Sequence, residues 1–310
     1  MESSTIAVSA ADGTPLHTYR WLPDGPPRAV VQVVHGMAEH AKRYERFAEA
    51  LTGAGYAVYA HDQRGHGQTA SRADHGFFAE RDGWSTVVGD VSSLTEYAQA
   101  EHPGVPVVLF GHSMGSFVSR SYAALHGARL AGLILSGTAG DPGPLAVAGR
   151  ALASLQGRLR GRRHPSGLMD KLTFGTYNAK FKPNRTDFDW LSRDEAEVDT
   201  YVADPLCGNT FTTTFFSDLL GGLQEINRTS AYAAVPRDLP ILVFSGALDP
   251  VGEDGKGPRA VAEAYRSAGV ADVTLTIYPD GRHEMLNETN RDEVTANVLA
   301  WLDEHLPTRD

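Results

Sequence analysis

The sequence lacks the features that mark several specialised classes of protein. Its 310 residues include one cysteine, Cys207, so no disulfide can form within the chain. No apolar run approaches the ~18 residues of a membrane-spanning helix, and residues 1–10 carry no basic segment of the kind that opens a signal peptide. These absences predict a soluble protein of the cytoplasm, in which Cys207 is expected to be buried and unreactive.

Positive charge is also scarce. The chain has 28 Lys and Arg residues against 38 Asp and Glu residues, which gives a formal net charge of -10. An acidic chain binds polyanions poorly, so we expect no nucleic-acid partner. Hydrophobic residues make up 42% of the sequence and charged residues 21%, which suits a globular protein able to bury a large core.

Segments with the character of strands and helices alternate at both ends of the chain. After a predicted hairpin over residues 5–21, buried strands and helices follow one another. The predicted strands are 29–34, 56–60, 105–110, 130–135, 241–245 and 273–278. The predicted helices are 44–52, 84–100, 114–126, 258–267 and 292–305. This alternation is typical of a mostly parallel central sheet flanked by helices, an α/β fold.

The alternation stops between residues 140 and 235, where the sequence shows no clear buried strand. We therefore predict an α/β core domain of residues 1–139 and 236–310. An inserted, mainly helical cap of residues 140–235 is predicted to interrupt it. Active sites of such sheets lie at the carboxyl ends of the strands, so a cap that leaves from this edge would roof the site.

Residues 111–115 read Gly-His-Ser-Met-Gly and form a G-x-S-x-G motif. The motif follows a predicted buried strand and precedes a predicted helix, which is the setting of a nucleophile at a sharp strand-to-helix turn. Glycine at both ends removes side chains that would collide with neighbouring backbone. Outside this setting the pattern is weak and also fits a serine in an ordinary turn. In this setting it predicts Ser113 as the nucleophile.

A serine hydroxyl attacks an ester only when a base takes its proton, and a histidine oriented by a carboxylate is the usual base. Asp249 and His283 both follow predicted strands after a few loop residues. They also occur in the chain order Ser, Asp, His that sheets of this kind use. We therefore predict a catalytic triad of Ser113, Asp249 and His283. Three nearby acids fit the spacing less well: Glu253, Asp254 and Asp280.

The oxygen that becomes negative during ester cleavage needs backbone N–H donors. One donor is predicted at Met114, which follows the nucleophile, and the second at Met37, in the loop after strand 29–34. Gly36 and His112, the chain neighbours of Met37 and Ser113, are predicted to contact the substrate.

Five segments of the sequence carry a resemblance to a known family. They are His35–His40 with Arg43 and Tyr44, His61–Gly67, Gly111–Gly115, Ser245–Val251, and His283 with Glu284. The chain resembles the monoacylglycerol lipase and lysophospholipase branch of the α/β-hydrolases, which is grouped with S33-type serine aminopeptidases. The resemblance implies the α/β-hydrolase fold, the same triad and oxyanion donors, a cap at residues 140–235, and a substrate with a single acyl chain.

The predicted reaction is hydrolysis of carboxylic esters through an acyl-enzyme, without a metal or other cofactor. By resemblance, the substrate is a monoacylglycerol or a lysophospholipid. The same triad would also serve a carboxylesterase for small esters, an aminopeptidase or a carbon–carbon bond hydrolase. A catalytically silent ligand-binding protein of the same fold is an alternative of a different class. The sequence leaves the acyl-chain length and the oligomeric state open.

The histidines and the arginine near the predicted site have simpler explanations than ligand binding. His35, Glu39 and His40 lack the spacing of the short zinc motifs, so no metal site is predicted. Arg64 is expected to pair with Asp62 or with a helix end rather than to bind phosphate.

One segment of the predicted cap looks like a basic amphipathic helix. Five apolar residues recur there at helical spacing: Leu145, Ala148, Leu152, Leu155 and Leu159. The charged residues around them are all arginines: Arg150, Arg158, Arg160, Arg162 and Arg163. Such a helix can lie on an anionic membrane, which makes peripheral membrane contact one expectation. The other expectation is a cap helix that packs its leucines onto the core and leaves its arginines in water.

Overall fold

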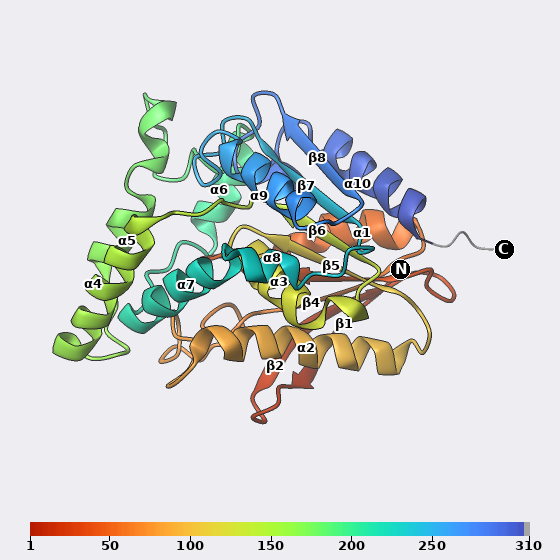
Figure 1. Cartoon of the computed structure of the whole chain (residues 1–310), viewed down its shortest axis with the longest axis horizontal. Helices are drawn as coiled ribbons and strands as arrows, with labels where there is room; N and C mark the ends of the chain where they lie inside the picture. Colours follow the sequence, from red (N-terminus) through yellow and green to blue (C-terminus); the bar gives the residue numbers. More distant parts are fainter. Residues whose placement is uncertain (307–310) are drawn as a thin grey trace.

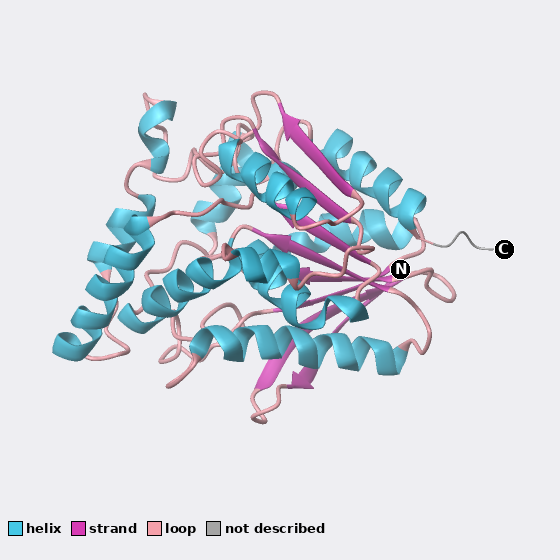
Figure 2. Cartoon of the chain, in the orientation of Figure 1, coloured by secondary structure: helices cyan, strands magenta, loops and turns pink. Residues whose placement is uncertain are grey.

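The computed structural model describes residues 1–306, and a single eight-stranded sheet forms its centre (Figure 1, Figure 2). The strands are β1 (Glu2–Ser9), β2 (Pro15–Leu22), β3 (Val30–Val34), β4 (Ala57–His61), β5 (Val107–His112), β6 (Gly132–Ser136), β7 (Ile241–Gly246) and β8 (Val273–Tyr278). Their spatial order is β1-β2-β4-β3-β5-β6-β7-β8. The pairs β1–β2 and β2–β4 are antiparallel, and the pairs from β4 to β8 are parallel.

Helices cover both faces of this sheet. They are α1 (Glu45–Gly53), α2 (Gly83–Glu101), α3 (Met114–His126), α9 (Lys256–Ser267) and α10 (Arg291–His305). Neighbouring residues of a strand point to opposite faces. Val33 and Phe110 therefore share a buried cluster with α1 and α10, whereas Val34 and Leu109 share one with α2, α3 and α9. Burial on both faces explains why the central strands are continuous apolar runs.

Between β6 and β7 the chain leaves the sheet for residues 140–235, referred to below as the insertion. It contains α4 (Pro144–Arg160), α5 (Gly167–Phe174), the short helix η3 (Tyr177–Phe181), α6 (Glu195–Ala203), α7 (Thr213–Ile226) and α8 (Thr229–Ala233). Figure 1 shows α4 and α5 at the left edge of the molecule, beyond the carboxyl ends of the parallel strands.

The insertion is anchored to the sheet domain through α7. Phe215 and Leu219 of α7 belong to the same buried cluster as Trp84 of α2 and Phe117 of α3. Because residues of the insertion and of the sheet domain share one buried cluster, the division into a core of residues 1–139 and 236–310 and a separate cap stays a prediction. The last four residues of that predicted core, 307–310, lie outside the described residues.

Candidate active site

Ser113 lies at the turn between β5 and α3, where the motif predicts the nucleophile. Its φ of 52° and ψ of -121° fall in a region that residues other than glycine adopt only under constraint. A Cβ on Gly115 would collide with the carbonyl oxygen of Val34, and one on Gly111 would collide with the hydroxyl of Ser119. The two glycines therefore allow α3 to approach β3 closely, and this close packing holds Ser113 in its strained turn.

His283 and Asp249 follow β8 and β7, and a hydrogen bond joins them. His283 Nδ1–H donates to Asp249 Oδ1 at 2.9 Å, and both side chains are buried. The other carboxylate oxygen of Asp249 accepts a hydrogen bond from Ser245 Oγ at 2.9 Å. A proton on Nδ1 leaves Nε2 free to accept the proton of a serine hydroxyl. The competing acid Asp254 instead forms an ion pair with Lys180.

The electrostatics of this pair suit a general base. Burial opposes the charged form of His283, but the carboxylates of Asp249, Glu284 and Glu39 together outweigh burial and raise the pKa of the imidazole. Burial also disfavours an ionised Asp249, yet the charge of His283 and the hydrogen bond from Ser245 keep the pKa of this carboxyl below its ordinary value. The site therefore stabilises the imidazolium that forms when His283 takes a proton.

Two glycines locate the candidate residues relative to one another. A Cβ on Gly36 would lie 3.2 Å from Ser113 Cβ and 3.3 Å from His112 Cδ2. A Cβ on Gly137 would lie 3.1 Å from His112 Cε1 and 3.0 Å from His283 Cε1. The rings of His112 and His283 are in contact, with centroids 4.7 Å apart. The structure thus brings Ser113, His112 and His283 into one small region at the carboxyl ends of the strands.

The two predicted oxyanion donors lie on loops that adjoin Ser113. Met114 is the first residue of α3, and the first N–H groups of a helix have no partner within it. Met37 follows Gly36, and within residues 1–306 its N–H has no hydrogen-bond partner. The next residue, Ala38, has a φ of 60°, which marks a sharp bend of this loop. Both N–H groups are therefore available to an oxygen atom next to Ser113.

A buried ion-pair network joins the loop after β3 to the loop after β8. Glu39 accepts hydrogen bonds from Gly36 N–H at 2.5 Å and from Arg43 at 2.8 Å. Arg43 also donates two hydrogen bonds to Glu284, at 2.6 and 2.7 Å. Burial raises the pKa of the Glu39 carboxyl. Burial also opposes ionisation of Glu284, but the charge and hydrogen bonds of Arg43, with smaller contributions from His112 and Asn287, outweigh burial and lower the pKa of Glu284 to about 2.

Among residues 1–306, His40, Asp204 and Cys207 place possible metal-ligand atoms within 4.8 Å of one another. His40 Nε2–H, however, already donates to Asp204 Oδ2 at 2.8 Å. Burial raises the pKa of the Cys207 thiol, whereas metal binding requires the thiolate. We therefore interpret these residues as a contact between the loop after β3 and the insertion.

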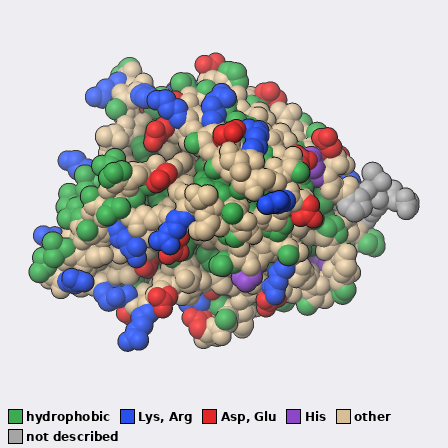
Figure 3. Space-filling model, viewed as in Figure 1, with side chains coloured by type: hydrophobic (Ala, Val, Ile, Leu, Met, Phe, Trp, Pro, Cys, Tyr) green, Lys and Arg blue, Asp and Glu red, His purple; other side chains and the backbone are tan. Residues whose placement is uncertain are grey.

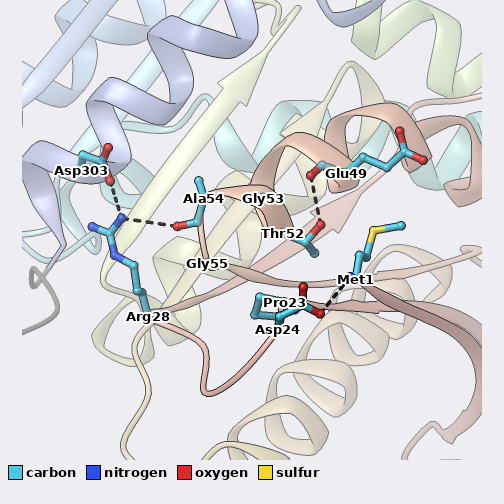
Figure 4. A pocket seen from close by; sticks show the side chains of 10 residues that line it. All are labelled: Met1, Pro23, Asp24, Arg28, Glu49, Thr52, Gly53, Ala54, Gly55 and Asp303. Atoms are coloured by element: carbon cyan, nitrogen blue, oxygen red, sulfur yellow. Dashed lines mark hydrogen bonds and ion pairs between the residues drawn. The ribbon is translucent and has the colours of Figure 1, made fainter.

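Figure 4 shows a cavity of about 820 Å³ that none of the candidate-site residues line. It is lined by residues from the chain start, the end of α1 and the end of α10, such as Asp24, Gly55 and Asp303. Gly55 immediately precedes Tyr56 and β4, so the cavity lies at the amino ends of the strands, opposite to Ser113. Its polar groups pair with one another, as the bond from Arg28 to Asp303 at 2.7 Å shows.

The structure also adds residues that sequence reasoning missed. Arg43 and Glu284 belong to the segments that carry the family resemblance, but the sequence assigns them no partner because they are 241 residues apart. Trp190 in the insertion carries no motif at all, yet its ring contacts that of His283 with centroids 5.1 Å apart. Only a three-dimensional structure reveals such contacts.

Comparisons with known proteins show the family to which the chain belongs. Residues 25–290 match the family described as serine aminopeptidase, S33. The chain belongs to this S33 family. The S33 chain is 33% identical to the monoglyceride lipase of Mus musculus over 291 residues, which cover 93% of this chain and 86% of the relative. It is 32% identical to the monoacylglycerol lipase of Mycolicibacterium smegmatis over 293 residues, which cover 92% of each chain.

A solved structure is similar along the whole length of this S33 chain. It is a highly thermostable carboxyl esterase from Bacillus coagulans in complex with glycerol, with a TM-score of 0.91 and 30% identity. The match covers 98% of this chain and 99% of the esterase. The predicted α/β-hydrolase fold, the resemblance to monoacylglycerol lipases and the predicted hydrolysis of esters are confirmed. The roles of individual residues stay predictions.

Proposed function

We propose that this S33 hydrolase cleaves monoacylglycerols into a fatty acid and glycerol through an acyl-enzyme on Ser113. The observation that carries the proposal is the grouping of a strained Ser113 with the buried pair of His283 and Asp249. The two relatives described above are named as lipases of monoglycerides, which favours this substrate class over peptides.

In this mechanism Ser113 Oγ attacks the ester carbonyl carbon while His283 Nε2 takes the hydroxyl proton. The carbonyl oxygen becomes negative and accepts hydrogen bonds from the N–H groups of Met37 and Met114. The carbon–oxygen bond to the alcohol then breaks, and His283 returns its proton to the leaving oxygen. A water molecule repeats the sequence on the acyl-enzyme and releases the acid. Asp249 keeps the imidazole oriented throughout.

The insertion supplies a surface suited to lipid. α4 packs against α7 through small residues, because Ala146 and Ala153 are buried and Gly149 faces Leu220 of α7. Large apolar side chains of α4 and α5 are therefore left exposed: Leu145, Val147, Leu155, Leu159, Leu168 and Leu172. Figure 3 shows apolar side chains gathered at this edge of the molecule with cationic side chains around them. An exposed apolar patch of this kind is typical of an interaction site.

The charges beside the patch divide into two groups. Arg163 forms ion pairs with Asp74 and Glu80, so its charge is already compensated. Arg158 and Arg160 form no ion pair within residues 1–306 and lie near the exposed leucines. Among the same residues, no helix has the length and apolarity needed to cross a bilayer. We propose that α4 and α5 rest on a lipid surface and bring the candidate active site to its substrate.

Labelling with a fluorophosphonate tests the chemistry. The wild type should be labelled, whereas a folded Ser113→Ala variant should not. Rates should then be measured on monoacylglycerols, lysophospholipids, short esters and aminoacyl amides. A preference for aminoacyl amides would overturn the proposed substrate, and a folded wild type that resists labelling would overturn the mechanism.

Vesicle co-sedimentation tests the lipid surface. The double change Leu145→Asp and Leu159→Asp should reduce binding to phosphatidylglycerol vesicles and slow hydrolysis of vesicle-borne monoacylglycerol. Hydrolysis of a water-soluble ester should stay unchanged. Leu125→Asp is a matched control, because Leu125 is 70% exposed and lies on α3 of the core. Equal binding of the double variant and the control would argue against the surface.

A further inference from the structure

Trp190 of the insertion lies directly against the candidate base. It belongs to the segment between η3 and α6, and only 6% of its surface is exposed. Its ring and that of His283 have centroids 5.1 Å apart and planes inclined by 38°. The backbone N–H of His283 donates to the carbonyl oxygen of Trp190 at 3.4 Å. The indole therefore contacts the imidazole from a segment nearly a hundred residues away in the sequence.

Hydrogen bonds hold the surrounding backbone in place. Glu284 N–H donates to the carbonyl oxygen of Leu191 at 2.8 Å. Arg282 donates to the carbonyl oxygen of Ser192 at 2.9 Å, and also to that of Asp189. The chain on either side of Trp190 is thus fixed to the chain on either side of His283. The position of the indole relative to the imidazole is set by these bonds and not by ring packing alone.

The contact has a direct consequence for charge. His283 becomes an imidazolium each time it takes the proton of Ser113 or of water. A cation within about 6 Å of the centroid of a tryptophan ring is attracted to the face of that ring, more strongly when both are shielded from water. Because the cation forms only on the way to the transition state, this attraction raises kcat rather than substrate affinity.

The second ring beside His283 does not cancel this effect. Burial, together with the neighbouring His283, lowers the pKa of His112 to about 3. His112 is therefore neutral at the pH at which a histidine base works, and adds no competing positive charge. Asp249 bonds to the Nδ1 side of the imidazole, so the indole acts in addition to the carboxylate.

We propose that Trp190 is a positioning residue for the general base, whose ring stabilises the imidazolium of His283 through a cation–π contact. This inference rests on the function proposed above and extends it to the insertion. The insertion then has a role in the chemistry as well as in access, because it supplies part of the environment of the base.

The pH profile separates this role from simple packing. The charged groups that act on His283 are Asp249, Glu284 and Glu39, with Arg43 between the two glutamates. Burial opposes the imidazolium, these carboxylates together outweigh burial, and the pKa of His283 is raised. Loss of the indole removes a further stabilisation of the cation. The pKa of His283 should then fall, and the acid limb of kcat/KM should move to lower pH.

The experiment compares Trp190→Phe and Trp190→Leu with a matched control, Trp301→Phe. Trp301 also stacks on a histidine, His305, with centroids 4.4 Å apart, but it lies on α10 outside the candidate site. Rates on p-nitrophenyl butyrate are measured from about pH 5 to about pH 9, which brackets the unperturbed pKa of histidine.

We expect kcat to fall about threefold in the phenylalanine variant and about tenfold in the leucine variant, following the graded strength of the contact. KM should change less than about twofold, since the lost contact is made in the transition state. The acid limb should move down by about half a pH unit in the leucine variant. Trp301→Phe should match the wild type in both kcat and the acid limb.

Two results would overturn the inference. One is a Trp190→Leu variant with wild-type kcat. The other is a variant that loses rate while its acid limb stays in place or moves up, as expected if the ring only fills space. If circular dichroism shows that the leucine variant does not fold, the shift of the acid limb of kcat/KM in the phenylalanine variant tests the inference instead. Fluorophosphonate labelling of Ser113 in the wild type distinguishes either result from failure of the proposed function.

Discussion

Arg43 lies between two buried carboxylates, and its removal should be unusually damaging. Side-chain exposures are 11% for Arg43, 4% for Glu39 and 7% for Glu284. The change Arg43→Gln leaves both carboxylates without their cation in a region from which water is largely excluded. Removing one partner of a buried ion pair costs about 3–5 kcal/mol, because the other partner keeps its desolvation penalty.

This free energy converts into a measurable shift of melting temperature. An unfolding entropy of about 2.1 cal/mol/K per residue gives about 0.65 kcal/mol/K for the 310 residues of the chain. A loss of about 3–5 kcal/mol therefore lowers Tm by about 5–8 °C at neutral pH. Activity should fall as well, since the network holds the loops that carry Met37 and His283.

The loss should depend on pH in a defined direction. Without Arg43, burial raises the folded-state pKa of Glu39 and Glu284 above the unfolded value of about 4.3. A carboxyl whose pKa is raised in the folded state leaves the free energy of unfolding unchanged below the unfolded pKa. Above that pKa it lowers the free energy of unfolding progressively as the pH rises. The Tm of Arg43→Gln should therefore lie closer to that of the wild type near about pH 4 than near about pH 7. The first pH is close to the unfolded pKa of the carboxyls, and the second is well above it.

Scanning calorimetry of Arg43→Gln, with Arg129→Gln as control, measures this effect. Arg129 pairs with Glu96 at the surface, where an ion pair contributes about 0–1 kcal/mol. Adding Glu284→Gln to Arg43→Gln should restore part of the lost Tm, because one uncompensated charge disappears. A Tm loss in Arg43→Gln no larger than that of the control would refute the reasoning about this network.

Three further predictions concern the candidate site. The pH profile of kcat/KM should rise with a midpoint above about 6.5, since Asp249 raises the pKa of His283, and a lower midpoint in steady-state rates would contradict that base. Asp249→Asn should remain folded yet lower kcat about 10,000-fold, which single-turnover kinetics can measure against the wild type. Gly115→Ala should destabilise the fold by about 1–3 kcal/mol in urea unfolding, because its Cβ would collide with Val34. Gly89→Ala, whose Cβ meets no atom within 4 Å, should not.

The elements that carry the candidate site could be predicted from the sequence because each is a local pattern. Predicted strands 241–245 and 273–278 correspond to β7 and β8 within one residue. β5 runs two residues beyond the predicted end, because Gly111 and His112 continue the parallel pairing with β6. A short apolar run bounded by turn residues predicts a buried strand. Because this signal lies within a few consecutive residues, a single sequence is enough to find such strands.

Partners far apart in the sequence could not be predicted in the same way. Arg64 was expected to pair with Asp62 or with a helix end, and the pairing with Asp62 is wrong. Arg64 bonds to Asp90 at 2.6 Å and to Asp12 at 2.8 Å, whereas Asp62 accepts from the N–H of Ala41. A buried charged side chain pairs with a polar or charged group that the fold brings near. Spacing along the sequence does not predict which group that is.

Helix α4 shows a related difficulty, in which the periodic pattern is correct but most of the leucines that form it are exposed. Its leucines recur at helical spacing, and packing on the core was one expectation for them. The buried side chains of the helix are Ala146 and Ala153, which lie beside Gly149 and Gly157 on the side that faces α7. Of the leucines, only Leu152 packs against the core, and it is half-buried. Small residues bring two helix axes close together, so α4 is anchored by these small residues together with Leu152. Leu145 and Leu159 are left in contact with solvent, and that exposure favours a lipid-facing role for the helix over a purely structural one.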